Sequence, residues 1–384
     1  MIRSPSAGLT LTLGSAQTLA WASSYYLPAI LAAPIANEMG LSSRWVFGAF
    51  SAALLLVAML GPSVGRLIDR QGGRGVLMAS NGLMALGLIA LALSQGAASL
   101  VFAWLVIGVG MAFGLYDAAF ATLSRLLGNQ ARASITGVTL VAGFASTIGW
   151  PITAFIESEW SWRAACVSWA LAHVLVGIPL NARLPKAERN ADVSVSSHTS
   201  PSPERPRFTM LLLAYVFAAG WFVSTAMAAH LPWLLQESGV SLSVAIAAAA
   251  LVGPAQVAAR MGEFVLLRRF HPLVAGRVAT TLHPIGATLL TLFGMPAAGF
   301  ALLHGAGNGM MTIASGTLPL ALFGSNGFGR RQGLIMVPAR TLQALAPLLF
   351  GLMIDQWGAG ALWLTSLLML VATLVLLSIR VPRG

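Results

Sequence analysis

The fold is decided by one short stretch of the sequence, Gly65-Arg66-Leu67-Ile68-Asp69-Arg70-Gln71-Gly72-Gly73-Arg74. It lies where a second apolar run ends and a third begins, and it gathers arginines, an aspartate and glycines in one loop. Charge concentrated between two long apolar runs is typical of a chain that crosses a membrane repeatedly. The stretch therefore predicts a multi-span membrane protein.

The composition of the chain agrees with this prediction. Of its 384 residues, 57% are hydrophobic and 9% are charged, and the mean hydropathy is +0.81. A soluble domain carries about 25% charged residues, so this chain could not face water without exposing large apolar patches. Because helices satisfy all of their backbone hydrogen bonds internally, the predicted class is an all-α integral membrane protein.

The net charge of +11 does not indicate nucleic-acid binding. The basic residues lie mostly at the edges of apolar runs, in alternate loops, which is the pattern that sets membrane topology. The single cysteine, Cys166, can form no internal disulfide. The first apolar run is too long for the core of a signal peptide and no cleavage motif follows it, so no cleavable signal peptide is expected.

The apolar runs predict twelve membrane-spanning segments, because a hydrocarbon core about 30 Å thick needs about 20 apolar residues per helix. The first six are expected near residues 8–34, 44–66, 75–95, 98–125, 133–156 and 162–183. The second six are expected near residues 209–235, 241–267, 273–294, 296–323, 331–355 and 359–380. Residues 184–208 are rich in serine, proline and charge and predict a disordered linker. The predicted domains are an N-terminal bundle (1–183), this linker, and a C-terminal bundle (209–384).

The distribution of charge also predicts the orientation. In a twelve-span chain, the linker, both termini and the loops after segments two, four, eight and ten hold nearly all of the basic residues. The opposite side has only Arg44 and Arg163, beside several acidic residues. By the positive-inside rule, both termini and the linker are predicted to be cytoplasmic, in an inner membrane of the bacterial type.

The two halves of the chain echo each other. Segment two carries Gly61-Pro62 and then Arg66-Leu67-Ile68-Asp69. Segment eight carries Gly253-Pro254 and then Arg260-Met261-Gly262-Glu263. In both, an acid follows the arginine one helical turn later, as expected for a duplicated six-span unit.

On these features the chain resembles a major facilitator superfamily transporter over essentially its whole length. The resemblance rests on the two sets of spans, the central linker and the pattern G-x-x-x-D-R-x-G-x-R at residues 65–74. It implies two pseudo-symmetric six-helix bundles, and a transporter rather than an enzyme. It also implies a gating loop, in which an aspartate meets a helix N-terminus and arginines hold the inner helix ends together. The residues at these positions are Gly65, Asp69, Arg70, Gly72 and Arg74. The alternative for these charges is simple snorkelling to the membrane surface.

Within the superfamily, the chain is most similar to the monocarboxylate-porter and oxalate–formate branch. Oxalate–formate antiporters use one cation on segment eight and one on segment eleven, and Arg260 and Arg340 match those positions here. In monocarboxylate porters an acid precedes the segment-eight arginine by four residues; Gln256 replaces it here, which puts proton coupling at that pair in question. The segment-four arginine of drug–proton antiporters is replaced by Trp104, which argues against that class.

Few charged residues fall inside the predicted spans, where each costs roughly 2.5–3.5 kcal/mol. Arg260 and Arg340 are predicted to bind a small anion, since a guanidinium offers an oxyanion a fixed fork of donors. Asp117 and Glu263 are predicted to be proton-coupling carboxylates. The alternative is that these charges are internal struts, with Arg260 paired to Glu263 and Arg340 to Asp117 or to a helix C-terminus.

Four further side chains are candidate substrate contacts. Trp21 and Tyr25 lie on segment one, and His304 and Asn308 share one face of segment ten. Ordinary helix packing is the alternative for all four. No pair of histidines has an acidic or cysteine companion at ligand spacing, so the sequence predicts neither a metal site nor a cofactor.

Together these features predict a monomeric secondary transporter that works by alternating access. Its expected cargo is a small organic anion, a monocarboxylate, moved by proton coupling or exchange, and its other partner is the lipid bilayer. The alternative is an efflux pump for a neutral drug or an arsenical-type metalloid toxicant. In that case Arg260 would be structural. The stretches 143–151 and 305–309 also resemble those of bacterial transporters for metalloid or arsenical efflux.

Overall fold

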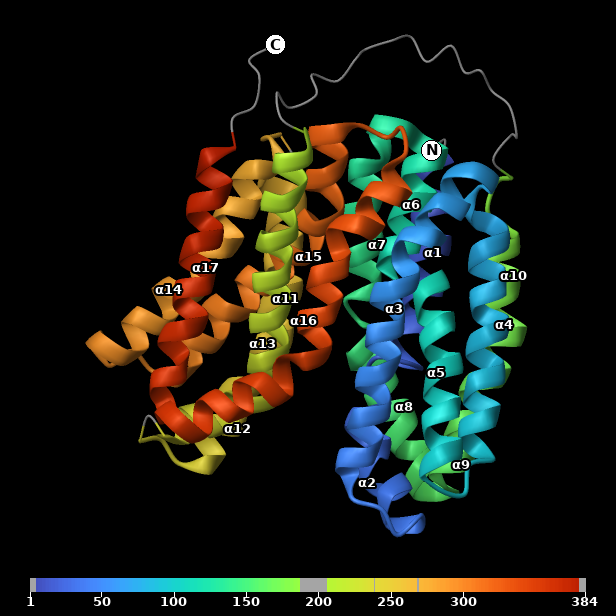
Figure 1. The fold of residues 1–384 in the computed structure, drawn as a ribbon, viewed down its shortest axis with the longest axis horizontal. Coiled ribbons are helices and arrows are strands. Elements are labelled where there is room, and N and C mark those ends of the chain that lie inside the picture. The colour runs from blue at the N-terminus through green and yellow to red at the C-terminus, as the bar shows by residue number, and fades with distance from the viewer. Residues whose placement is uncertain (1–4, 187–205, 238, 268, 380–384) are drawn as a thin grey trace. The chain divides into compact units, whose positions relative to one another are not determined.

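The computed structural model describes residues 5–186, 206–237, 239–267 and 269–379. Within these ranges the chain is built from helices and contains no strand (Figure 1), which confirms the all-α prediction there. It divides into two compact units, here called unit 1 (Met1–His198 with Ser325–Leu334) and unit 2 (Thr199–Gly324 with Ile335–Gly384). Most of the predicted linker, residues 187–205, lies outside the described residues.

Unit 1 contains the helices of the six N-terminal predicted spans. In chain order they are α1 (Pro5–Ala22), α2 (Pro28–Glu38), α3 (Ser43–Gln71), α4 (Gly73–Ala92), α5 (Ala97–Gly114), α6 (Tyr116–Leu127), α7 (Ala131–Ala142), α8 (Ala145–Glu159), α9 (Trp162–Ala172) and α10 (Ile178–Ala182). A 3-10 turn, η1 (Gly128–Gln130), precedes α7, and a π-helical turn, η2 (His173–Gly177), joins α9 to α10.

The fourth predicted span is broken into α5 and α6, and neighbouring helices explain where. Leu115 adopts an extended conformation, with φ −79° and ψ −170°, between the two helices. The Gln17 side-chain amide of α1 donates to the Gly114 carbonyl at 2.6 Å, so this freed carbonyl is satisfied from another helix. The break thus leaves a helix C-terminus and a helix N-terminus beside α1, inside unit 1.

Glycines let the helices of unit 1 approach closely. A Cβ at Gly108 of α5 would lie 2.8 Å from the Ala53 Cα on α3, and one at Gly114 would lie 1.8 Å from Ser80 Oγ on α4. Atoms cannot approach that closely, so a side chain at either position would push α5 away from its neighbours. This is why α5 can lie against both α3 and α4 (Figure 1).

An ion pair ties α2 to α9 in unit 1. Arg163 Nη2 lies 2.8 Å from Glu38 Oε1, and Trp162 Nε1 donates to the other carboxylate oxygen. Arg163 also donates to the carbonyls of Ala92 and Ser94, at the end of α4. The hydrogen bond from Arg163, and then that from Trp162, lowers the pKa of Glu38 below its ordinary value.

Unit 2 contains the helices of the C-terminal spans. They are α11 (Pro206–Glu237), α12 (Leu242–Ala250), α13 (Val252–Gly262), α14 (Pro272–Phe293), α15 (Ala297–Phe323), most of α16 (Phe328–Trp357) and α17 (Ala361–Ser378). A π-helical turn, η3 (Glu263–Leu267), continues α13, and a 3-10 turn, η4 (Gly358–Gly360), precedes α17. The break between α12 and α13 has a local cause, because Pro254 has no N–H for the carbonyl of Ala250. α11 begins inside the range predicted for the linker.

The two units repeat one packing pattern. In unit 1, α5 packs on α3 and α4, and α4 packs on α9; in unit 2, α15 packs on α13 and α14, and α14 packs on α17. These helices occupy matching positions in the two predicted sets of spans, as a duplicated unit requires. Each predicted span consists mostly of helical residues. Within the described ranges, seven helical stretches are long and apolar enough to cross a membrane.

Candidate functional site

Asp69, in the last turn of α3, caps the N-terminus of α16. Its Oδ1 accepts a hydrogen bond from the Gly329 N–H at 2.9 Å, and its Oδ2 accepts one from the Arg330 N–H at 2.8 Å. Residues 325–334 belong to unit 1, so this contact is internal to that unit. Hydrogen bonds and the helix dipole both stabilise a carboxylate at this position. The gating role of loop 65–74 stays a prediction.

The stretch 65–74, predicted as a loop, is helical except at Gly72, because α3 continues to Gln71 and α4 begins at Gly73. Its glycines are required for close packing and for the turn. A Cβ at Gly65 would lie 2.0 Å from the Gly329 carbonyl oxygen, so α3 and α16 can approach here only without a side chain. Gly72 has φ +81°, a left-handed conformation that glycine adopts without strain, in the turn between α3 and α4. Arg70 is exposed and Arg74 is half-buried.

The candidate contacts Trp21 and Tyr25 belong to an aromatic cluster in unit 1. The centroid of the Trp21 ring lies 4.7 Å from that of Tyr116, 5.1 Å from that of Tyr25 and 6.2 Å from that of Tyr26. Tyr25 also makes an edge contact with Phe50 at 5.5 Å. Aromatic rings attract one another at these separations. The structure therefore brings the two predicted residues together against α3 and α6.

Asp117 lies in the first turn of α6 and is half-buried. The buried side chain of Gln332, in the segment of α16 that belongs to unit 1, donates from Nε2 to Asp117 Oδ1 at 3.2 Å. This partner could not be recognised from the sequence, because a glutamine at a polar helix end is common.

Arg260 is buried inside unit 2, with 6% of its surface exposed. It reaches from α13 onto α15, where its Nε donates to the Gly309 carbonyl and its Nη2 donates to Thr312 Oγ1, both at 3.4 Å. Glu263 follows one turn later and is also buried, at 4% exposure. Residues three apart lie on one helix face, so the two predicted charges are neighbours.

Arg340 of α16 is likewise buried in unit 2, with 5% of its surface exposed. Its Nη1 donates to Gln343 Oε1 at 2.9 Å, and its guanidinium carbon lies 4.8 Å from the centroid of the Trp221 ring. The ring offers the cation its negative face. Gln343 was missed in the sequence, although its position three residues after an arginine was a usable signal.

His304 and Asn308 line one small cavity in unit 2, together with Ser224, Met311 and Met369. The cavity has room for about one water molecule. The structure therefore confirms that the two predicted residues share a face, but the space beside them is too small for an organic anion.

The proton positions around His304 follow from its neighbours. Thr365 Oγ1 donates to the Leu362 carbonyl at 2.8 Å, so it accepts from His283 Nε2, 3.0 Å away. In the neutral pair, His283 Nδ1 then accepts from His304 Nδ1 at 3.0 Å. His304 Nε2 is left as an acceptor. Within the described ranges, no group of three or more histidine, cysteine, aspartate or glutamate side chains is arranged to hold a metal ion.

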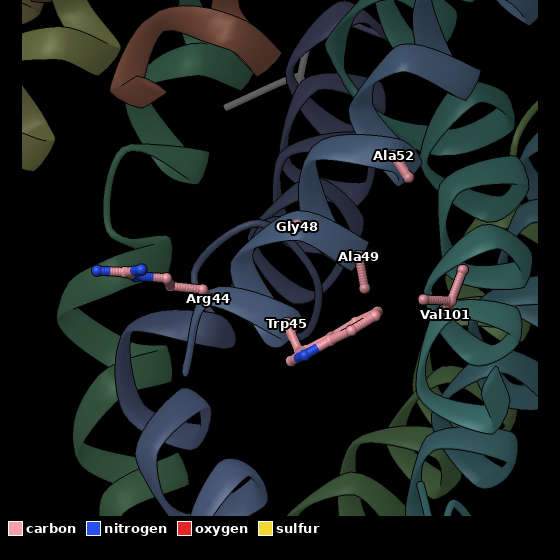
Figure 2. A pocket seen from close by; sticks show the side chains of 6 residues that line it. All are labelled: Arg44, Trp45, Gly48, Ala49, Ala52 and Val101. Carbon is pink, nitrogen blue, oxygen red and sulfur yellow. The ribbon is translucent and has the colours of Figure 1, made fainter. Parts of the chain in front are cut away.

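An open groove lies on unit 1 between α3 and α5 (Figure 2). Its lining is Arg44, Trp45, Gly48, Ala49, Ala52 and Val101. Figure 2 shows the Trp45 ring directed toward Val101, whereas the Arg44 guanidinium points away from it. A ligand site normally combines an apolar lining with several converging polar groups. This groove lacks them among its lining residues, so we do not place the cargo there.

The comparisons with known proteins agree with this architecture. Residues 13–302 match the Major Facilitator Superfamily. The 3-(3-hydroxy-phenyl)propionate transporter of Escherichia coli (strain K12) is 30% identical over 373 residues, which cover 93% of this chain and 83% of that protein.

Solved structures show the same fold. The human organic anion transporter MFSD10 has a TM-score of 0.73 at 17% identity, over 97% of this chain and 100% of that one. The E. coli fucose:proton symporter FucP has a TM-score of 0.73 at 15% identity, over 97% of each chain. That fold has twelve helices in two bundles, as predicted. The superfamily match covers residues 13–302, which is most of this chain, and the E. coli transporter is 30% identical to it. This chain therefore belongs to the Major Facilitator Superfamily of secondary transporters.

Proposed function

We propose that this transporter carries a small organic anion, a monocarboxylate, by alternating access with proton coupling or exchange. The observation that carries the proposal is the burial of two guanidiniums, those of Arg260 and Arg340, inside unit 2. A charge buried in a membrane protein costs several kcal/mol and is a functional-site candidate. The cargo named for the E. coli relative contains a propionate group, which is a monocarboxylate. The likeness to the monocarboxylate-porter and oxalate–formate branch supports the same cargo.

The chemistry of the guanidinium group favours anion binding at each arginine. Arg260 donates to a carbonyl and a hydroxyl, and Arg340 donates to an amide and lies against an indole ring. These contacts help to orient the guanidinium planes. A carboxylate would add charge-assisted hydrogen bonds, which are about twice as strong as neutral ones.

We further propose Asp117 and Glu263 as the proton-coupling carboxylates. An anion bound at Arg260 would add negative charge one turn from Glu263, and like charges raise the proton affinity of a carboxylate. Binding of the anion and of a proton would then favour each other, which is the requirement for symport. In this proposal the protein is a monomer in a bacterial-type inner membrane. Two bundles (1–183 and 209–384) are joined by a linker (184–208), which lies with both termini on the cytoplasmic side.

Transport by purified protein in proteoliposomes tests the proposal. With an imposed pH gradient and a panel of labelled monocarboxylates and dicarboxylates, the wild type should accumulate at least one monocarboxylate. Arg260→Gln and Arg340→Gln should each lower that flux about tenfold or more, because a hydrogen bond to a charged group contributes about 1.5–3 kcal/mol.

A matched control is Arg277→Gln. Arg277 is a half-buried arginine of the same unit, and it donates to the carbonyls of Leu376 and Ile379 at the end of α17. Its loss should leave the choice of cargo unchanged. If the folded wild type moves no carboxylate, or if Arg260→Gln and Arg340→Gln both keep full flux, the proposal is wrong. Export of a neutral or metalloid compound would then be measured in the same vesicles.

A further inference from the structure

Two buried polar atoms on α1 have no hydrogen-bond partner among the residues that the structure describes. One is Oε1 of Gln17, an acceptor, and the other is Nε1 of Trp21, a donor. Gln17 is 1% exposed and Trp21 is 4% exposed, so neither is satisfied by bulk solvent. Buried polar atoms in folded proteins are nearly always hydrogen-bonded, so an unpartnered donor and an unpartnered acceptor on one helix require an explanation.

The two side chains share one face of α1 and contact neighbouring residues of unit 1. Gln17 and Trp21 are four residues apart, so their side chains project from one face of α1. The Gln17 amide nitrogen is held 2.6 Å from the Gly114 carbonyl, and the Trp21 ring lies 4.7 Å from the Tyr116 ring. Gly114 ends α5 and Tyr116 begins α6. Both side chains are therefore directed at the break in the fourth span.

The charge at this break favours a neutral group over an anion. The N-terminus of α6 is electropositive because of the helix dipole. Asp117, in the first turn of α6, already places a carboxylate there. A second negative charge beside it would be repelled, whereas an uncharged group with one donor and one acceptor would not.

We propose that Gln17 and Trp21 form a subsite for a hydroxyl group carried on an aromatic ring. The hydroxyl oxygen would accept from Trp21 Nε1, and its proton would be donated to Gln17 Oε1, so one group would satisfy both atoms. Tyr25, Tyr26 and Tyr116 surround the indole and offer ring faces and edges against which an aromatic cargo packs. The inference rests on the proposed function, because it specifies the monocarboxylate as a hydroxyaryl carboxylate.

An unpartnered indole N–H alone does not identify such a subsite. Trp104 of α5 is fully buried, its Nε1 also has no partner within the described residues, and its ring lies 5.3 Å from that of Phe50. The inference depends on the paired acceptor of Gln17. Trp104 is therefore the matched control, since it has the same residue type, unit and burial.

The test compares uptake of 3-phenylpropionate with that of its meta- and para-hydroxylated derivatives, using the full-length protein in proteoliposomes. The wild type should prefer one hydroxylated cargo by about tenfold to hundredfold, the effect of two neutral hydrogen bonds. Trp21→Phe keeps a ring but removes the N–H, and it should bring the preference close to one while uptake of 3-phenylpropionate persists. Gln17→Met also removes the hydrogen bond to the Gly114 carbonyl, so it is read only in protein that remains folded, where it should likewise bring the preference close to one. Trp104→Phe should leave the preference unchanged.

Each outcome decides between defined alternatives. A wild-type preference near one, or a preference that survives both Trp21→Phe and Gln17→Met, overturns the inference; an internal water then satisfies the two atoms. Transport of aliphatic but not aromatic monocarboxylates also overturns it and leaves the proposed function standing. If no carboxylate is transported at all, the proposed function fails, and the inference fails with it.

Discussion

Removing the Asp69 carboxylate should release two backbone amides of α16 to exchange with solvent. In Asp69→Ala, the N–H groups of Gly329 and Arg330 lose acceptors that lie 2.9 and 2.8 Å away. Hydrogen bonds to a charged group contribute about 1.5–3 kcal/mol, and a charge at a helix end adds about 0.3–1 kcal/mol. Because Asp69 is half-buried, we expect the lost stabilisation to be near the low end, about 2 kcal/mol. This corresponds to a population about thirtyfold larger for the locally open state, in which these amides exchange with solvent.

Hydrogen–deuterium exchange followed by mass spectrometry measures this directly, in peptides that cover residues 325–334. Exchange there should be about thirtyfold faster in Asp69→Ala than in the wild type. Asp69→Asn should be intermediate, because the amide keeps one acceptor oxygen and turns a donor toward the other N–H. Glu38→Gln, which removes a carboxylate elsewhere in unit 1, should leave these peptides unchanged. If exchange in a folded Asp69→Ala variant rises less than about threefold, the carboxylate is not what protects these amides.

Three further predictions concern unit 1, and thermal unfolding in detergent checks each. Gly114→Ala should cost about 1–3 kcal/mol, because its Cβ would lie 1.8 Å from Ser80 Oγ; an unchanged Tm would contradict the close packing. The pKa of Glu38 is lowered from 4.5, chiefly by the hydrogen bond from Arg163. The contact between these two side chains should therefore contribute its full stabilisation to the folded state above pH 4.5, and that stabilisation should be lost as the pH falls through the lowered pKa. The Tm advantage of wild type over Glu38→Gln should accordingly shrink in acid, and a constant difference would refute the linkage. His173→Leu should cost about 1–3 kcal/mol, because it leaves Asn81 Oδ1, now 2.7 Å from the ring nitrogen, unsatisfied, whereas Ser23 Oγ can still donate to the Leu19 carbonyl; a loss below about 0.5 kcal/mol would argue against this.

The overall fold could be predicted because its signals in the sequence are redundant. Apolar run lengths, the alternation of basic loops and the loop at residues 65–74 each led to the same architecture. The break at Leu115 could not be predicted, since no proline marks it. It depends on Gln17 of another helix, which takes the freed carbonyl of Gly114. By contrast, the break before α13 could be predicted from the sequence, because Pro254 has no backbone N–H with which to continue the helix.

The charged members of the candidate site could be predicted from the sequence, whereas their neutral hydrogen-bond partners could not. Arg260 and Arg340 are conspicuous, because a charge within an apolar run is rare. Their neutral partners Thr312 and Gln343 are not, since such residues occur in many spans without a ligand. The pairing of Gln332 with Asp117 joins positions 215 residues apart, and only the folded chain brings them together.

Hydrogen-bond closure distinguishes His173 from Gln17 and Trp21 of the proposed subsite. A bilayer interior offers no bulk water, so a polar side chain in a span must be satisfied by protein, by a bound water or by cargo. His173 lies 2.7 Å from Ser23 Oγ on one side and from Asn81 Oδ1 on the other, and this chain of contacts is complete within unit 1. In the same unit, the acceptor Gln17 Oε1 and the donor Trp21 Nε1 have no hydrogen-bond partner within the described residues. Loss of His173 should therefore lower stability without changing the choice of cargo, whereas loss of the Trp21 N–H should change the choice of cargo at nearly constant stability.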